Sequence, residues 1–154
     1  MFRTEQPPIL NSVLFILGKW GPVWLIVYGF YCLYNQWDLL LTFVGFVLFN
    51  DILNRTLKQL IREERPRQWT TDKTHFLYYG MPSGHAQHAF FVAAFLLLAN
   101  NPNLYFLLPM CVVILLERVY SRQHTIKQVF VGSILGIGLA FLAHRTLNEI
   151  RKIQ

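Results

Sequence analysis

The sequence predicts an all-α fold, namely a polytopic transmembrane helical bundle of about five spans. Two observations carry this prediction. Hydrophobic residues make up 54% of the 154 residues and charged residues only 14%, whereas soluble domains contain about 25% charged residues. The apolar residues are also gathered into runs that short polar segments separate. The length fits a single domain over residues 1–154. The net charge is +6, and the basic residues cluster between the apolar runs.

Five apolar runs are expected to form the helices, and in chain order they cover residues 21–34, 37–53, 84–99, 104–116 and 129–142. Several runs are shorter than the roughly 20 residues that a membrane span needs, so they must include neighbouring polar residues. Four or six spans also fit the pattern.

The first two runs have polar extensions. Residues 9–20 either lengthen the first run or lie at the membrane interface, because Lys19 and Trp20 suit the headgroup level. The second run continues as a polar helix that is expected to stop at Pro66, and a loop over residues 67–80 follows.

Two further segments are expected to be irregular. Residues 100–103, with the sequence NNPN, predict a turn. Pro7 and Pro8 interrupt the N-terminal segment where a signal peptide would be continuously apolar, so we expect a retained cytosolic or interfacial arm.

Alternating spans place three polar segments on the same side of the membrane. They are the end of the second run (58–65), the start of the third (83–85) and the connection between the fourth and fifth (118–124). These segments can therefore meet in one pocket, and we expect an active site there, at one membrane face.

The first segment is basic. Lys58, Arg62 and Arg65 are spaced four and three residues apart, so on a helix they would share one face. Three cations on one face suit a phosphate or diphosphate. The alternative, which is the stronger one for this segment alone, is a solvated face paired with Glu63 and Glu64 or extended toward lipid headgroups.

The second segment is Pro82-Ser83-Gly84-His85. Ser83 is expected to cap the helix that follows, and the free N–H groups there, including that of Gly84, would form an anion site. His85 would lie within reach of that anion. A cap alone explains Ser83 but leaves His85 without a partner, while His88 is expected to face a neighbouring helix.

The third segment contains Arg118, His124 and Gln128. The spacing of four residues places the Gln128 side chain beside the His124 ring, where its carbonyl could orient the imidazole. An ordinary interfacial loop is the alternative.

Together the three segments supply several cations, a helix N-terminus and two histidines. This set fits phosphoryl transfer through a phosphohistidine, in which one histidine attacks phosphorus and the other protonates the leaving oxygen. Because no carboxylate cluster is available, we expect no metal and no other cofactor. Basic and aromatic residues do not interleave as nucleic-acid binding requires.

These residues resemble the signature of the phosphatidic acid phosphatase type 2 superfamily, which reads KxxxxxxRP, PSGH and SRxxxxxHxxxD. The chain matches it with Lys58 and Arg65-Pro66, with Pro82 to His85, and with Arg118 and His124, in a motif core of about residues 50–135. Two positions depart from it: Glu117 replaces the usual serine and Gln128 the usual aspartate. The sequence HTIKQV at 124–129 is similar to dolichyl diphosphatases.

The resemblance implies a role for each matching residue. His124 would be the nucleophile and His85 the general acid, with Arg118 completing the catalytic set. Lys58, Arg65, Ser83 and Gly84 would bind the substrate's phosphoryl oxygens. Gln128 would orient His124 without a carboxylate's charge, which favours a better leaving group such as a diphosphate.

The substrate implied by the resemblance is a polyprenyl diphosphate, in particular dolichyl diphosphate, which would be hydrolysed to the monophosphate in the endoplasmic reticulum membrane of a eukaryote. Phosphatidate or another lipid phosphate is the nearest alternative, and a catalytically silent lipid-binding protein is another. Membrane lipids are the expected partners, and the sequence does not indicate an oligomeric state.

The orientation in the membrane stays open. The resemblance places the site in the lumen, whereas eleven of the fourteen Lys and Arg residues fall on the site's side and favour a cytosolic face.

Overall fold

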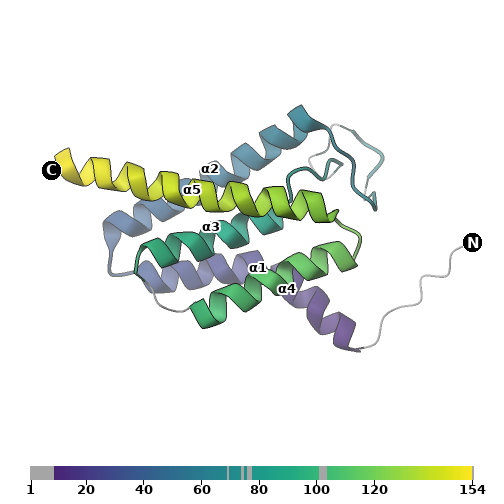
Figure 1. The fold of residues 1–154 in the computed structure, drawn as a ribbon, viewed down its shortest axis with the longest axis horizontal. Helices are drawn as coiled ribbons and strands as arrows, with labels where there is room; N and C mark the ends of the chain where they lie inside the picture. The colour runs from purple at the N-terminus through teal and green to yellow at the C-terminus, as the bar shows by residue number, and fades with distance from the viewer. Residues whose placement is uncertain (1–8, 69, 74, 76–77, 101–103, 154) are drawn as a thin grey trace, which may run out of the picture.

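The computed structural model describes residues 9–68, 70–73, 75, 78–100 and 104–153 as a bundle of five helices (Figure 1). The helices are α1 (Ile9–Leu33), α2 (Trp37–Ile61), α3 (Gly84–Leu98), α4 (Leu104–Tyr120) and α5 (Ile126–Ile153). The all-α prediction is confirmed, and each expected apolar run coincides with a helix except for Tyr34 and Ala99 at the ends of two runs. Residues 1–8 of the arm expected over residues 1–12, and most of the turn expected at 100–103, lie outside the described residues.

The structure decides between the two alternatives for residues 9–20, and the ends of α2 and α5 differ from the predicted ones. Residues 9–20 form one continuous helix with the first apolar run. α5 continues well beyond residue 142, to Ile153. α2 ends at Ile61 and not at Pro66, because Arg62 adopts the left-handed conformation (φ 54°) and its N–H donates to the Lys58 carbonyl, which closes the helix.

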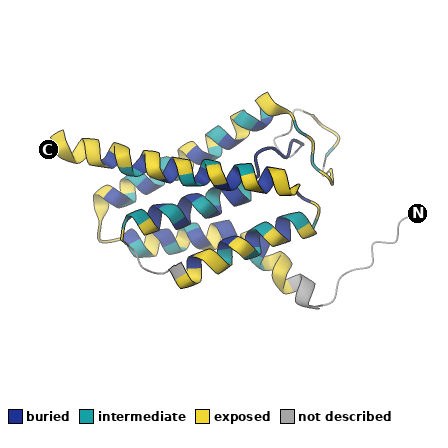
Figure 2. Ribbon diagram, viewed as in Figure 1, coloured by how far each residue is buried: buried dark blue, intermediate teal, exposed yellow. Residues whose placement is uncertain are grey.

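In the part of the chain that the structure describes, three helices are long and apolar enough to cross a membrane, at Val13–Leu33, Trp37–Ile61 and Ile126–Ile153. α3, with 15 residues, and α4, with 17, are shorter than the roughly 20 residues of a full span. Figure 2 shows exposed residues along the outer faces of the bundle. Many of these are large and apolar, including Trp24, Leu41, Ile52, Leu116 and Phe130, as expected for a lipid-facing surface.

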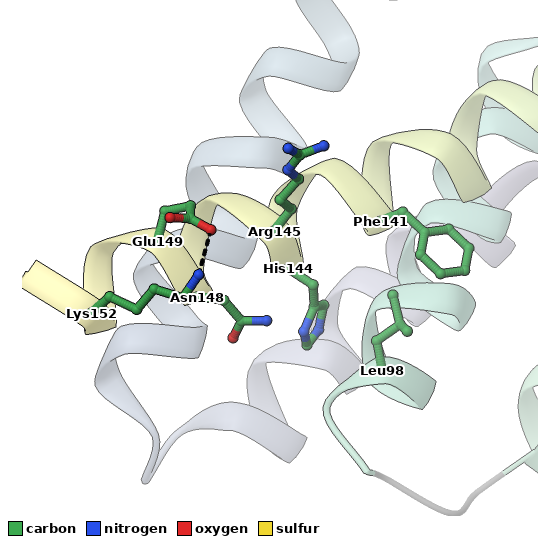
Figure 3. A pocket seen from close by; sticks show the side chains of 7 residues that line it. All are labelled: Leu98, Phe141, His144, Arg145, Asn148, Glu149 and Lys152. Atoms are coloured by element: carbon green, nitrogen blue, oxygen red, sulfur yellow. Dashed lines mark hydrogen bonds and ion pairs between the residues drawn. The ribbon is translucent and has the colours of Figure 1, made fainter.

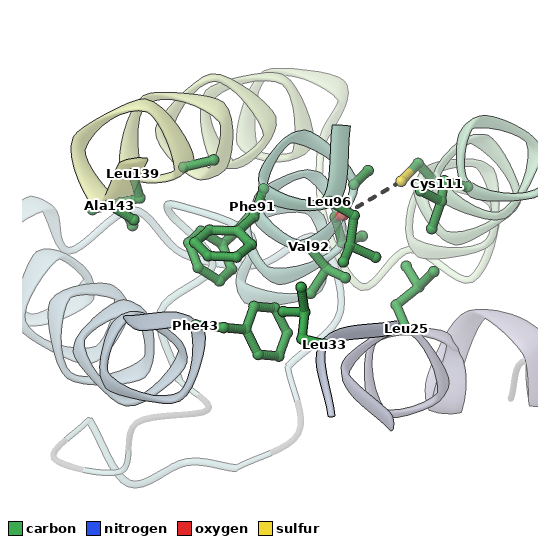
Figure 4. Close-up of a cluster of buried hydrophobic side chains, with 14 of the residues drawn as sticks. Leu25, Leu33, Phe43, Phe91, Val92, Leu96, Cys111, Leu139 and Ala143 are labelled. Atoms are coloured by element: carbon green, nitrogen blue, oxygen red, sulfur yellow. Dashed lines mark hydrogen bonds between the residues drawn. The ribbon is translucent and has the colours of Figure 1, made fainter. Parts of the chain in front are cut away.

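α3 is the central helix and contacts each of the other four. Phe91 and Phe95 of α3 are fully buried and pack against Phe43 of α2, with ring centroids 5.3 to 5.8 Å apart (Figure 4). These rings form the middle of the apolar core. The N-terminal end of α3, with Gly84 and His85, lies at one end of the bundle.

Two glycines of α5, Gly132 and Gly136, allow its backbone to approach that of α3. A Cβ atom on Gly132 would lie 2.5 Å from the Ser83 carbonyl oxygen. Small residues four apart permit such contacts in membrane helices. The Ser83 N–H also donates to the Gln128 carbonyl, at 3.0 Å, so the start of α3 is fixed to the first turn of α5.

We expect Gly136→Ala to destabilise the fold. The added Cβ would lie 2.8 Å from the Phe91 backbone nitrogen and would also overlap the Gln87 carbonyl oxygen, and backbone atoms cannot move aside as a side chain can. Overpacking of this kind costs about 1–3 kcal/mol, so thermal unfolding in detergent should shift downward by about 3–10 °C. Gly138→Ala is the matched control, because nothing lies within 4 Å of the position that its Cβ would take. Equal melting temperatures for the two variants would contradict the close approach.

Candidate active site

A cavity of about 530 Å³ lies where α2 ends, α3 begins, and α4 connects to α5. The expected convergence of three polar segments is confirmed, since the cavity is lined by Lys58, Arg65, Gly84, His85, Arg118 and His124. The lining that comes from α1 is mostly apolar, with Phe15, Trp20, Pro22, Val23 and Ile26 beside Lys19. The cavity therefore combines a cationic and a hydrophobic side.

His124 lies in the short connection between α4 and α5. Arg122 adopts the left-handed conformation (φ 56°) in this turn, and the His124 N–H donates to the Arg118 carbonyl at 3.1 Å. The ring is buried, with only 3% of the residue exposed. The turn thus returns the chain toward the cavity and fixes the backbone that carries the imidazole.

The tautomer of His124 follows from its contact with Gln128. Nδ1 lies 3.1 Å from Gln128 Oε1, which also accepts from the Thr125 N–H at 3.2 Å. The Gln128 amide nitrogen donates to the Glu64 carbonyl at 2.9 Å, so the amide oxygen and nitrogen cannot exchange places. Oε1 must then accept a hydrogen bond from Nδ1–H, which leaves the lone pair of His124 on Nε2.

The charge state of His124 suits a nucleophile. Burial, followed by the positive charges of Arg65 and Lys58, lowers the pKa of His124 well below its usual range. The ring is therefore neutral at neutral pH. Its Nε2 lies 3.4 Å from Nη1 of Arg65, so the lone pair faces a cation that would hold a phosphoryl oxygen.

His85, in the first turn of α3, has two alternative partners at Nε2. The Lys19 carbonyl oxygen lies 3.2 Å away and accepts when Nε2 is protonated. Nη1 of Arg118 lies 3.4 Å away and donates when Nε2 is unprotonated. Partners for both protonation states suit a group that gives and takes a proton.

Lys58 and Arg65 are basic side chains with no acidic partner among the described residues. Within the described part of the chain, neither forms an ion pair, and Lys58 is only 5% exposed. Burial, followed by the charge of Arg118, lowers the pKa of Arg65 to about 10, so it remains protonated at neutral pH. Two partly dehydrated basic groups that lack an acidic partner in the described chain are expected to attract an anion strongly.

The prediction that Lys58, Arg62 and Arg65 share one helix face is wrong, because α2 ends at Ile61. Lys58 still belongs to α2, whereas Arg65 reaches the cavity from the segment that follows and donates through Nε to the Tyr79 carbonyl at 3.3 Å. The Arg62 side chain is exposed and donates to the Gln59 carbonyl, and Arg62 does not line the cavity. The spacing predicted a regular helix where the left-handed Arg62 redirects the chain.

Ser83 occupies the predicted position but does not make the predicted capping hydrogen bond. It is the N-cap residue of α3, but its side chain makes no capping hydrogen bond, and its buried Oγ has no partner among the described residues. Ser83 is not among the residues that line the cavity, although Gly84 is. A role of Ser83 in binding the substrate stays a prediction.

Glu117 and His88 are also placed by the structure. The buried Glu117 carboxylate pairs with the Arg118 guanidinium, so Arg118 has a counter-ion in the described chain, unlike the two basic side chains discussed above. This pair requires Gly18 on α1, where any Cβ would overlap the Glu117 side chain. His88 lines the cavity, with Nδ1 2.9 Å from the Gly84 carbonyl oxygen.

A buried polar chain beneath the site was not predicted. Asn54 Nδ2 donates to Gln87 Oε1 at 2.7 Å and to the Pro82 carbonyl at 3.3 Å, and Gln87 Nε2 donates to Asn50 Oδ1. The sequence feature that indicates it is a pair of asparagines four residues apart in an apolar run. Gly84 fits this arrangement, since a Cβ there would lie 3.0 Å from Asn54 Oδ1.

A second hollow lies at the opposite end of α3 and α5 (Figure 3). Its residues are Leu98, Phe141, His144, Arg145, Asn148, Glu149 and Lys152, none of which belongs to the three polar segments. The His144 ring is held by the Phe95 carbonyl, 3.2 Å from Nε2. The described residues contain no group of three His, Cys, Asp or Glu side chains that could hold a metal ion.

Comparisons with known proteins agree with this geometry. A model of the PAP2 superfamily matches residues 38–152. Dolichyldiphosphatase 1 of Dictyostelium discoideum is 33% identical over 121 residues, which are 70% of this chain and 52% of that protein. Lipid phosphate phosphatase epsilon 1, chloroplastic, of Arabidopsis thaliana is 28% identical over 151 residues, which are 92% of this chain and 52% of that protein. The chain spans about half the length of these curated relatives.

A solved structure also has this fold. It is described as the first transmembrane PAP2 type phosphatidylglycerolphosphate phosphatase from Bacillus subtilis, and it matches with a TM-score of 0.67. The match covers 97% of this chain and 82% of that chain at 24% identity. The transmembrane helical bundle expected from the sequence is thereby confirmed.

Proposed function

Because the chain belongs to the PAP2 superfamily, we propose that it is an integral membrane lipid phosphatase that hydrolyses a polyprenyl diphosphate, with dolichyl diphosphate as the preferred substrate. The observation that carries this proposal is the neutral, Gln128-oriented His124, whose Nε2 lies beside Arg65 in a cavity that Lys58 also lines. The similarity to a dolichyldiphosphatase supports the choice of lipid.

The proposed reaction proceeds in two steps. His124 Nε2 attacks the terminal phosphorus and forms the N–P bond while the bond from phosphorus to the bridging oxygen breaks. His85 gives its proton to that oxygen as the lipid monophosphate leaves. Water then attacks the phosphohistidine, its proton passes to His85, and inorganic phosphate departs as Nε2 regains its lone pair.

The remaining residues stabilise charge and hold the lipid. Lys58, Arg65 and Arg118 would bind the three phosphoryl oxygens, on which charge is spread in the transition state. Gln128 would stabilise the positive charge that the ring acquires, through the hydrogen bond at Nδ1. The apolar wall from α1 would contact the first isoprene units of the lipid.

The test is release of inorganic phosphate by the native chain in detergent, with EDTA present throughout. We expect release from dolichyl diphosphate to be faster than from phosphatidate or phosphatidylglycerol phosphate and to be unaffected by EDTA. Faster release from phosphatidate would favour the second candidate, a lipid phosphate phosphatase, which the relative matched over 92% of this chain supports. No release from any of these lipids would indicate a silent lipid-binding protein.

A further inference from the structure

The amide of Gln128 is held on every side. Its oxygen accepts from His124 and from the Thr125 N–H, and its nitrogen donates to the Glu64 carbonyl and to the Glu63 carboxylate, with 3.0 Å between Gln128 Nε2 and Glu63 Oε1. All four hydrogen-bonding positions of the amide are therefore occupied. One of these four partners, the Glu63 side chain, is a carboxylate.

Glu63 carries a negative charge at neutral pH. Its other carboxylate oxygen, Oε2, accepts from Lys127 Nζ at 2.8 Å. The hydrogen bond from Lys127 and then that from Gln128 lower the pKa of Glu63, against the opposing effect of burial. The Glu63 side chain is 30% exposed, so water screens part of this charge.

The backbone around Glu63 is fixed relative to α5. The Glu63 carbonyl accepts from the Gly80 N–H at 2.8 Å, and the Gln128 carbonyl accepts from the Ser83 N–H. A Cβ on Gly80 would lie 2.5 Å from Gln128 Oε1 and 2.8 Å from its Nε2. Glycine at position 80 is therefore what leaves room for the amide between Glu63 and His124.

We propose that Glu63 is a positioning residue of the phosphatase: its carboxylate, acting through the Gln128 amide, supplies the negative charge that stabilises His124 when the ring becomes positive. This inference rests on the proposed function. Glu63 polarises the amide by accepting from its N–H, and the amide oxygen passes that polarisation to Nδ1–H of His124. The charge that an aspartate at position 128 would place beside the ring thus lies one group further away.

The same contacts explain why position 128 is an amide. A carboxylate there would face the Glu63 carboxylate at about 3 Å and the Glu64 carbonyl at a similar distance. Two carboxylates so close cannot both ionise without a large shift in their proton affinity. Residues 63 and 128 therefore act as a pair in which one member carries the charge.

The test compares four variants with the native chain, using dolichyl diphosphate in detergent and full pH profiles of kcat/KM. Glu63→Gln keeps an acceptor for the Gln128 N–H but removes the charge. We expect kcat to fall about tenfold with KM unchanged, as for other partners that orient a histidine, and the acidic limb of the profile to move to lower pH. The other charged groups that face His124, namely Lys58, Arg65, His85 and Arg118, are the same in both proteins.

The remaining variants separate this role from a general loss of charge. Glu64→Gln removes the same charge one residue along, where the carboxylate accepts a hydrogen bond from the Tyr78 hydroxyl, and should leave kcat and the profile close to native. Gln128→Glu should be strongly impaired, and the swap Glu63→Gln with Gln128→Glu should recover most of the activity, because a single charge is restored.

Each result decides a separate point. A native kcat and profile in Glu63→Gln, an equal effect in Glu64→Gln, or a swap no better than Gln128→Glu alone would each overturn the role of Glu63 while the native activity stands. A native chain that releases no phosphate from any of the lipids would overturn the proposed function and, with it, this inference.

Discussion

His124→Ala is expected to abolish phosphate release from dolichyl diphosphate, with kcat lowered at least about 10³-fold. Removing a nucleophile from a covalent mechanism eliminates the intermediate, and the rate that remains comes from binding and charge stabilisation alone. The measurement is inorganic phosphate release, together with acid-labile labelling of the protein by a substrate carrying ³²P in the terminal phosphate. Only the native chain should acquire the label.

His144→Ala is the matched control for this variant. It removes the same side chain at the opposite end of the bundle, in the hollow that Figure 3 shows. We expect its turnover to stay within about threefold of native. Turnover by His124→Ala above a few per cent of native, with a normal melting temperature, would contradict the role of His124 as nucleophile.

His85→Ala is expected to show a loss that depends on the leaving group. A general acid contributes about 10²–10⁴-fold when the departing oxygen needs a proton. We therefore expect the largest decrease for phosphatidate, whose leaving group is an alkoxide, and a smaller one for dolichyl diphosphate. With p-nitrophenyl phosphate, which leaves as a stabilised phenolate, formation of the phosphohistidine should be nearly unaffected.

His88→Ala serves as the comparison, because His88 lies one turn further along α3 and also borders the cavity. Its loss is expected to lower the rates by a similar, small factor for all three substrates. If His85→Ala lowered the rates for all three by the same factor, the residue would act in binding and not as a proton donor.

The convergence of the site could be predicted because it depends on topology and local spacing. A chain that alternates across a membrane returns the ends of alternate spans to one face, and this topology predicts the shared cavity of Lys58, His85 and His124. The contact between Gln128 and His124 follows from a separation of four residues at the start of a helix.

The parts that could not be predicted depend on single backbone conformations or on contacts between distant segments. The left-handed Arg62 ends α2 early, and no spacing rule distinguishes it from one more helical residue. The contact of Glu63 with Gln128 joins residues 65 positions apart, and the sequence indicated only that Glu63 could pair with neighbouring cations. The close approach of α5 to α3 depends on which glycines face inward.

The apolar wall that α1 contributes to the cavity has a kinetic consequence. Phe15, Trp20 and Val23 border the cavity and are 42%, 51% and 49% exposed, so the site presents an accessible hydrophobic surface to a lipid. A lipid substrate on such a surface arrives by lateral diffusion in two dimensions. Its effective concentration is then its mole fraction in the bilayer or micelle, and diluting the membrane with inert lipid slows the encounter even when the amount of substrate in the tube is constant.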